Sequence, residues 1–223
     1  MRTGGSMGSS RRGAWFPGLL AVAAALGAFG FLYRAVRDGK TREIDERATL
    51  RLQQVRAPWF RRLMWIVSWP GFPPQSRIIP WAASLGWLLF GKPLEALFQL
   101  LAWGTGVISF AVKRSMRRPR PDHPEIAVTK ANIGGSSFPS GHVLNYIGVY
   151  GFLLYQLRRD KPLTWPRRIA SWVLAGMLAL VGVSRMYLGH HWMSDVTASY
   201  LLGGSYLFVL TRIYERVKAR QAT

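Results

Sequence analysis

The chain has 223 residues, enough for one domain of ordinary size, and it contains no cysteine, which excludes a disulfide framework. Its formal net charge of +20 would suit a nucleic-acid-binding protein, but Lys and Arg cluster at the ends of apolar runs, as in LRRDKPLTWPRR. That placement is typical of membrane topology, so the composition favours a membrane protein over a nucleic-acid-binding one.

Six apolar stretches are the main feature of the sequence. Three of them have about 20 residues and at most one charge, the length that a helix needs to cross a hydrocarbon core of about 30 Å. The other three are shorter, and we interpret them as further spans because they stand among the long ones. We therefore expect an all-α, polytopic membrane bundle with six transmembrane helices, at 14–33, 78–91, 93–112, 142–157, 169–185 and 191–212.

The first span follows a basic N-terminal tail, 1–13, and could belong to a signal peptide. Its length exceeds the apolar region of about 7–15 residues that signal peptides use, so we predict an uncleaved anchor. Six spans place the 1–13 tail, the 158–168 loop and the basic 213–223 tail on one face, which the positive-inside tendency makes cytoplasmic. The opposite face is also basic, so some of its charges need another explanation.

Segment 34–77 differs from the rest, because it mixes charges, leucines and tryptophans and is broken by four prolines. We interpret it as one or two amphipathic helices lying in the membrane interface, with a solvated loop as the alternative. The sequence shows no internal repeat and no separate soluble region, so we predict a single domain over 1–223.

A first polar cluster, KRSMRRPRP, spans Lys113–Pro121 directly after the third predicted span. Such a patch can be a stop-transfer signal, but the predicted topology places it on the non-cytoplasmic side, where basic runs are disfavoured. Alternating Arg and Pro also stiffen the backbone, and guanidinium forks make bidentate bonds to phosphate. The cluster therefore suits a tetrahedral oxyanion.

A second cluster, PSGH, ends at His142, where the fourth predicted span begins. Unpaired N–H groups and the positive end of the helix dipole make a helix N-terminus an anion site. Ser140 could bind a ligand there or simply cap the helix. Gly141 would let an oxygen approach the backbone, and His142 could exchange a proton near neutral pH.

A third cluster, SRMYLGHHWMSD, joins the fifth and sixth predicted spans. His191 and Asp195 are four residues apart and would be neighbours on one helical face. A carboxylate beside an imidazole fixes its tautomer and stabilises the imidazolium, as in nucleophilic or basic histidines. The pair could instead be structural, although an ionisable residue within a span is a functional candidate by default.

Predicted spans three and five end on the face where spans four and six begin, so the three clusters should meet there as a phosphate-binding catalytic pocket. The residues resemble the complete signature of the type 2 phosphatidic acid phosphatase (PAP2) superfamily, which also includes soluble vanadium haloperoxidases. The matching pieces, within 113–195, are Lys113, six residues and Arg120-Pro121; Pro139-Ser140-Gly141-His142; and Ser184-Arg185, five residues, His191, three residues and Asp195.

The resemblance implies hydrolysis of a lipid phosphate through a phosphohistidine, without a metal or other cofactor. His191 would attack phosphorus, Asp195 would hold its ring, and His142 would protonate the leaving group and then activate water. The residues implied to bind the phosphate oxygens are Lys113, Arg120, Ser140, Gly141 and Arg185. His190 would be a bystander.

The expected partner is a lipid phosphate within the bilayer, such as an isoprenyl diphosphate, phosphatidic acid or phosphatidylglycerol phosphate. The predicted topology places the site on the outward face, and similarity to bacterial members implies the cytoplasmic (inner) membrane. Two alternatives stay open: a phosphotransferase that uses the same histidine, and a non-catalytic phospholipid-binding protein. The apolar spans disfavour a soluble vanadate-dependent oxidase, and the oligomeric state is open.

Overall fold

The computed structural model describes residues 16–129, 133–159 and 163–221, and every regular element within them is helical. In chain order, the helices are α2 (Phe16–Arg37), α3 (Arg42–Gln53), α4 (Pro58–Ser68), η1 (Trp69–Gly71), α5 (Gln75–Leu89), α6 (Pro93–Ala102), α7 (Thr105–Ser115), α8 (Gly141–Asn145), η2 (Tyr146–Tyr150), α9 (Gly151–Arg159), α10 (Trp165–Tyr187) and α11 (Met193–Gln221).

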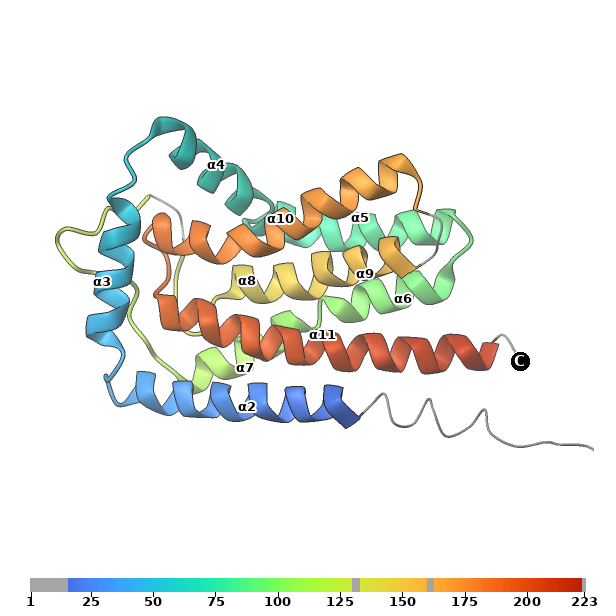
Figure 1. Ribbon diagram of the computed structural model, residues 1–223, viewed down its shortest axis with the longest axis horizontal. Coiled ribbons are helices and arrows are strands. Elements are labelled where there is room, and N and C mark those ends of the chain that lie inside the picture. Colours follow the sequence, from blue (N-terminus) through green and yellow to red (C-terminus); the bar gives the residue numbers. More distant parts are fainter. Residues whose placement is uncertain (1–15, 130–132, 160–162, 222–223) are drawn as a thin grey trace, which may run out of the picture.

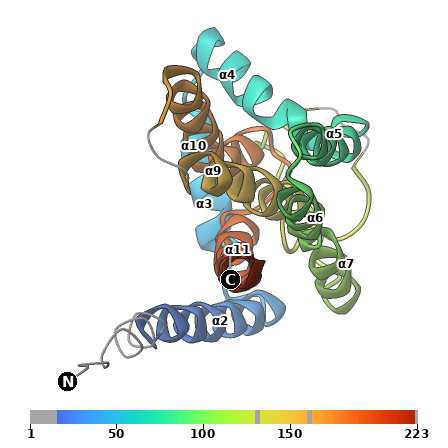
Figure 2. The same cartoon turned by 90° about the vertical axis from the view of Figure 1, so that its right-hand side faces the viewer.

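The long helices run roughly along one axis, and α3 lies across one end of them (Figure 1). The C-terminal end of α11 and the first turns of α2 lie at the opposite end (Figure 1). Seen along the bundle, α9 lies near the middle, in contact with α6, α10 and α11, while α2 covers one side of α11 (Figure 2). The described residues therefore form a helical bundle with one open end and one end crossed by α3.

Four helical stretches are long and apolar enough to cross a membrane: 16–37, 93–115, 165–187 and 193–221. The first has large apolar side chains that stay exposed, including Phe16 at 65% and Phe31 at 77%. A helix with exposed apolar side chains of this kind suits a lipid environment rather than water. The all-helical membrane bundle predicted from the sequence is therefore confirmed, and the protein is an integral membrane protein.

The predicted count of six spans is not confirmed. Helix α5, at the second predicted span, has 15 residues. The fourth predicted span is built from α8, η2 and α9, a helical stretch interrupted by a π-helical turn. The C-terminal boundary also differs from the prediction, because α11 continues through most of the 213–223 tail to Gln221. The 1–13 tail lies outside the described residues.

Gly148 sets how closely η2 approaches the neighbouring helices α6 and α7. A Cβ on Gly148, in η2, would lie 2.2 Å from the carbonyl oxygen of Ala102 and 2.7 Å from Oγ1 of Thr105. Because a Cβ cannot occupy that space, only glycine lets η2 contact the junction of α6 and α7. The close approach fixes the position of α8, which carries His142.

Segment 34–77 contains α3, α4 and the short η1, and side-chain hydrogen bonds join α3 and α4 to the rest of the bundle. Ser184 of α10 donates to the carbonyl of Met64 in α4 at 2.5 Å. The Gln53 side chain, at the end of α3, donates to the carbonyls of Ala127 and Tyr187, both at 2.8 Å. The segment therefore packs over the end of the bundle where α10 ends, and its predicted place in a membrane interface stays a prediction.

Candidate active site

The structure brings all eight predicted site residues to one end of the bundle. Lys113 lies in the last turn of α7, and Arg120 follows in the connection to α8. Ser140 and Gly141 begin α8, with His142 in its first turn. The other three lie around the short connection from α10 to α11, namely Arg185, His191 and Asp195.

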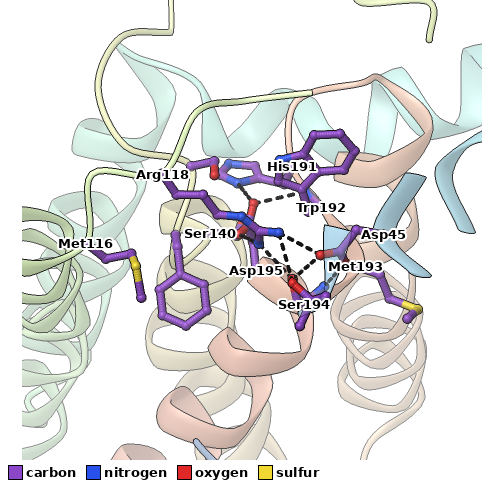
Figure 3. A network of polar contacts seen from close by, with 12 residues as sticks. Asp45, Met116, Arg118, Ser140, His191, Trp192, Met193, Ser194 and Asp195 are labelled. Atoms are coloured by element: carbon purple, nitrogen blue, oxygen red, sulfur yellow. Dashed lines mark hydrogen bonds and ion pairs between the residues drawn. The ribbon is translucent and has the colours of Figure 1, made fainter. Parts of the chain in front are cut away.

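His191 and Asp195 form the centre of this group and are almost completely buried, with 2% and 0% of their surfaces exposed. Nδ1 of His191 lies 3.4 Å from Oδ2 of Asp195, longer than a formed charge-assisted hydrogen bond. The backbone N–H of Trp192 donates to the same Oδ2 at 2.9 Å. The backbone of Trp192, which lies between the two residues in the chain, therefore holds the Asp195 carboxylate beside the imidazole (Figure 3).

Three cations surround His191 from separate elements. Arg120 donates to the carbonyl of His190 at 2.8 Å, and the same Nη1 lies 3.4 Å from Nε2 of His191. Lys113 donates to the carbonyl of Ser136 at 2.5 Å. Arg185 is fully buried and donates through Nη1 to the hydroxyl of Ser68 at 2.6 Å.

Several buried polar atoms of the site have no hydrogen-bond partner among the described residues. They are Nε and Nη2 of Arg185, Nε of Arg120, Oγ of Ser140, Nε2 of His142 and Nδ1 of His191. Buried donors without partners carry a free-energy cost, and their concentration in one place is typical of a site that binds a polar ligand. Four of these six atoms belong to cationic or hydroxyl groups that suit an anion.

The start of α8 distinguishes between a simple cap and a ligand site. The Ser140 side chain makes no capping hydrogen bond, and its backbone N–H donates to the hydroxyl of Ser199 at 2.8 Å. A Cβ on Gly141 would make only ordinary contacts, 3.5 Å from Oγ of Ser109, so protein packing does not require glycine here. Both observations favour the ligand-binding interpretation of Ser140 and Gly141 over the capping one.

The pKa of His191 is lowered well below its ordinary value, first by burial and then by the positive charges of Arg185, Arg120 and Lys113. The imidazole is therefore neutral at neutral pH, with one ring nitrogen able to act as a nucleophile or base. Burial and Arg185 also lower the pKa of His190, to about 4. His190 differs in its contacts, because its Nε2 lies 2.7 Å from the carbonyl of Thr129, which engages it with the backbone.

The aromatic ring of Phe72, which follows η1, packs against His142 and Arg185. Its centroid lies 4.7 Å from that of His142, edge to face, and the guanidinium carbon of Arg185 lies 5.0 Å from the same centroid. Gly71 packs directly on His142, since a Cβ there would lie 2.3 Å from Cδ2 of the imidazole. Segment 34–77 thus contributes contacts to His142 and Arg185 that the sequence did not predict.

Two further charged residues were missed as members of the site. Arg118 bonds to Oδ1 of Asp195 at 2.5 Å and to Oδ2 of Asp45 at 2.6 Å (Figure 3). Arg118 stands inside the basic cluster noted in the sequence, so alternation of Arg and Pro was a usable signal. Asp45 lies in α3, more than 60 residues before that cluster, and nothing in its neighbourhood marked it.

Known phosphatases are similar to this chain. The PAP2 superfamily matches residues 94–219. Phosphatidylglycerophosphatase B of Bacillus subtilis is 28% identical over 194 residues, covering 85% of this chain and 93% of the relative. A decaprenylphosphoryl-5-phosphoribose phosphatase of Mycobacterium tuberculosis is 37% identical over 98 residues, covering 44% of this chain and 49% of the relative.

A solved structure resembles the whole bundle. The crystal structure of a transmembrane PAP2-type phosphatidylglycerolphosphate phosphatase from Bacillus subtilis matches with a TM-score of 0.76 and 25% identity, covering 88% of this chain and 96% of that chain. The matched family region contains every residue of the site described above except those contributed by segment 34–77. The chain therefore belongs to the PAP2 superfamily and is a membrane phosphatase of that family.

Proposed function

We propose that the protein is a metal-independent lipid phosphatase that forms a phosphohistidine on His191. The observation that carries the proposal is the placement of a buried imidazole between a carboxylate and three cations. Asp195 lies on the Nδ1 side of the ring, whereas Arg120 lies on the Nε2 side. An anionic phosphoryl group approaching Nε2 would therefore meet positive charge at the nucleophile.

In the first step, Nε2 of His191 attacks phosphorus, a P–N bond forms, and the bond from phosphorus to the lipid oxygen breaks. His142 gives a proton to that leaving oxygen, and Asp195 stabilises the positive charge that develops on the imidazole. In the second step, His142 takes a proton from water, the resulting hydroxide attacks phosphorus, and the P–N bond breaks. Inorganic phosphate leaves, and His191 returns to its neutral form.

Cations of the protein stabilise the charge on the transferring group. Lys113, Arg120 and Arg185 would bind its equatorial oxygens together with Ser140 and the Gly141 backbone. The unpartnered Nε and Nη2 of Arg185 support this role, because they are buried donors that a phosphate could accept from. Phosphoryl transfer depends mainly on positioning and charge stabilisation, so fixed cations could replace a divalent ion.

The substrate that we place first is phosphatidylglycerol phosphate, because the Bacillus subtilis relatives cover most of this chain. A polyprenyl-linked phosphate comes second, supported by the Mycobacterium tuberculosis relative over less than half of the chain. Both are amphiphiles, and a site at the helix ends suits a phosphate at the interface with tails in lipid. We propose that this end faces outward from a bacterial inner membrane, with both termini cytoplasmic.

A panel of lipid mono- and diphosphates, assayed with purified protein in detergent and excess EDTA, tests the proposal. Phosphate release should persist in EDTA, be lost in His191→Ala, and be nearly unchanged in His190→Ala, the matched control one position away. A strict requirement for Mg²⁺, or loss of activity in His190→Ala alone, would contradict it. Adding a lipid alcohol separates hydrolysis from phosphotransfer, because only the transferase would form a new lipid phosphate.

A further inference from the structure

Arg118 connects two buried carboxylates that lie on different helices. Its Nη1 donates to Oδ1 of Asp195 at 2.5 Å and to Oγ of Ser194 at 2.7 Å. Its Nη2 donates to Oδ2 of Asp45 at 2.6 Å and approaches Oγ1 of Thr41 at 3.3 Å. Both terminal nitrogens are therefore engaged within the protein, on the side of Asp195 away from His191 (Figure 3).

Asp45 is anchored on the start of α11 as firmly as on Arg118. Its Oδ1 accepts from the backbone N–H of Ser194 at 2.8 Å, and its Oδ2 accepts from the Ser194 hydroxyl at 2.6 Å. Only 1% of Asp45 and none of Asp195 is exposed, and the Arg118 side chain is 11% exposed. Two carboxylates this deeply buried are stable as anions only because a cation bridges them.

We propose that Asp45 and Arg118 are positioning residues that orient the carboxylate of Asp195 toward His191. The proposal rests on the phosphohistidine mechanism above. Arg118 holds Oδ1, and the Trp192 backbone N–H holds Oδ2 at 2.9 Å, so the carboxylate plane has two fixed points. Oδ2 is then the oxygen that faces Nδ1 of His191.

The bridge also balances the charge of Asp195. Without the guanidinium of Arg118, two buried carboxylates would stand on either side of Ser194 with no cation between them, and their repulsion would displace the Asp195 carboxylate from His191. A displaced carboxylate could not stabilise the imidazolium that forms when His191 is phosphorylated. Asp45 acts on Asp195 through Arg118, because it holds Nη2 of Arg118 and thereby the direction in which Nη1 points.

This role predicts a particular kinetic pattern. The terminal nitrogens of Arg118 are occupied by protein groups, and the carboxylate of Asp45 has only acceptors, so neither Asp45 nor Nη1 or Nη2 of Arg118 is available to donate to the phosphate. Losing the bridge should therefore lower kcat and leave KM nearly unchanged. A role limited to anchoring α3 would instead lower thermal stability and leave the kcat of the folded protein intact.

The test measures kcat and KM of Asp45→Asn, Arg118→Lys and Thr49→Val in the same detergent, with the folded fraction determined by size exclusion and thermal melting. Thr49 is the matched control, because it is a fully buried residue of α3 whose hydroxyl donates, among the described residues, only to the backbone carbonyl of Asp45 and not to its carboxylate. We expect Asp45→Asn and Arg118→Lys each to lower kcat at least about tenfold, as for loss of a charge-assisted hydrogen bond, with KM within about twofold. Thr49→Val should keep kcat within about twofold.

The double variant Asp45→Asn/Arg118→Lys adds a second measurement. Because Asp45 is proposed to act through Arg118, the Asp45 change should cost less than about threefold once Arg118 is altered. Wild-type kcat in Arg118→Lys, equal kcat losses in Thr49→Val and Asp45→Asn, or losses confined to KM would each overturn the inference. If His191→Ala is inactive in the same assay, such a result leaves the proposed function standing, whereas an active His191→Ala would refute the proposed function itself.

Discussion

Gly71→Ala probes the position of His142 without altering any polar group of the site. The new Cβ would lie 2.3 Å from Cδ2 of His142 and 3.0 Å from its Cγ and Nε2. Carbon atoms in contact stay about 3.5 Å apart, so the imidazole must move by about 1 Å. A misplacement of that size at a catalytic group costs about 100-fold in rate.

The assay is phosphate release from a lipid phosphate with an alkyl leaving group and from an analogue with an aryl leaving group. Because His142 is proposed to protonate the leaving oxygen, kcat/KM, which reports formation of the phosphohistidine, should fall about 100-fold for the alkyl substrate and much less for the aryl one. Gly86→Ala in α5 is the control, since a Cβ there meets nothing within 4 Å. Wild-type turnover of the alkyl substrate by folded Gly71→Ala, or equal losses with both substrates, would refute the reasoning.

Two further predictions concern pH and stability. The nucleophile must be neutral. Burial, and then the charges of Arg185, Arg120 and Lys113, lower the pKa of His191, so the acid limb of kcat/KM, corrected for substrate ionisation, should lie below pH 6.5. Arg120→Gln should move that limb to higher pH, and an unmoved limb at or above 6.5 would contradict the assignment. Gly148→Ala should destabilise the protein by about 1–3 kcal/mol, measured by thermal melting in detergent, because its Cβ would lie 2.2 Å from the Ala102 carbonyl oxygen. A melting temperature equal to that of wild type would show that η2 can move away from α6.

The sequence was most informative where chemistry is local. PSGH and the His191–Asp195 spacing are short patterns, and the direction in which each helix enters or leaves the bundle placed them at one end. Lengths and charges of the apolar runs were sufficient to predict a helical membrane bundle. They were less reliable for element boundaries, because a turn at Trp103 and Gly104 divides α6 from α7 within one predicted span.

Contacts made by segment 34–77 could not be predicted in the same way. Asp45, Ser68 and Phe72 reach the site only because α3 crosses the end of the bundle and α4 packs against α10 (Figure 1). Their partners lie 70 to 149 residues away along the chain, so no local spacing indicates the pairing. Tertiary packing, rather than any motif, makes this segment part of the site.

The central claim is a covalent bond between phosphorus and His191, and rapid-quench trapping tests it most directly. Protein mixed with a ³²P-labelled lipid phosphate, quenched in alkali and digested, should carry an acid-labile, base-stable label on the peptide that contains His191. With a labelled aryl analogue, whose leaving oxygen needs no proton, His142→Ala should increase the labelled fraction by slowing hydrolysis of the intermediate, and His191→Ala should abolish the label. Turnover without any labelled peptide in His142→Ala, or a label on a different residue, would contradict the account.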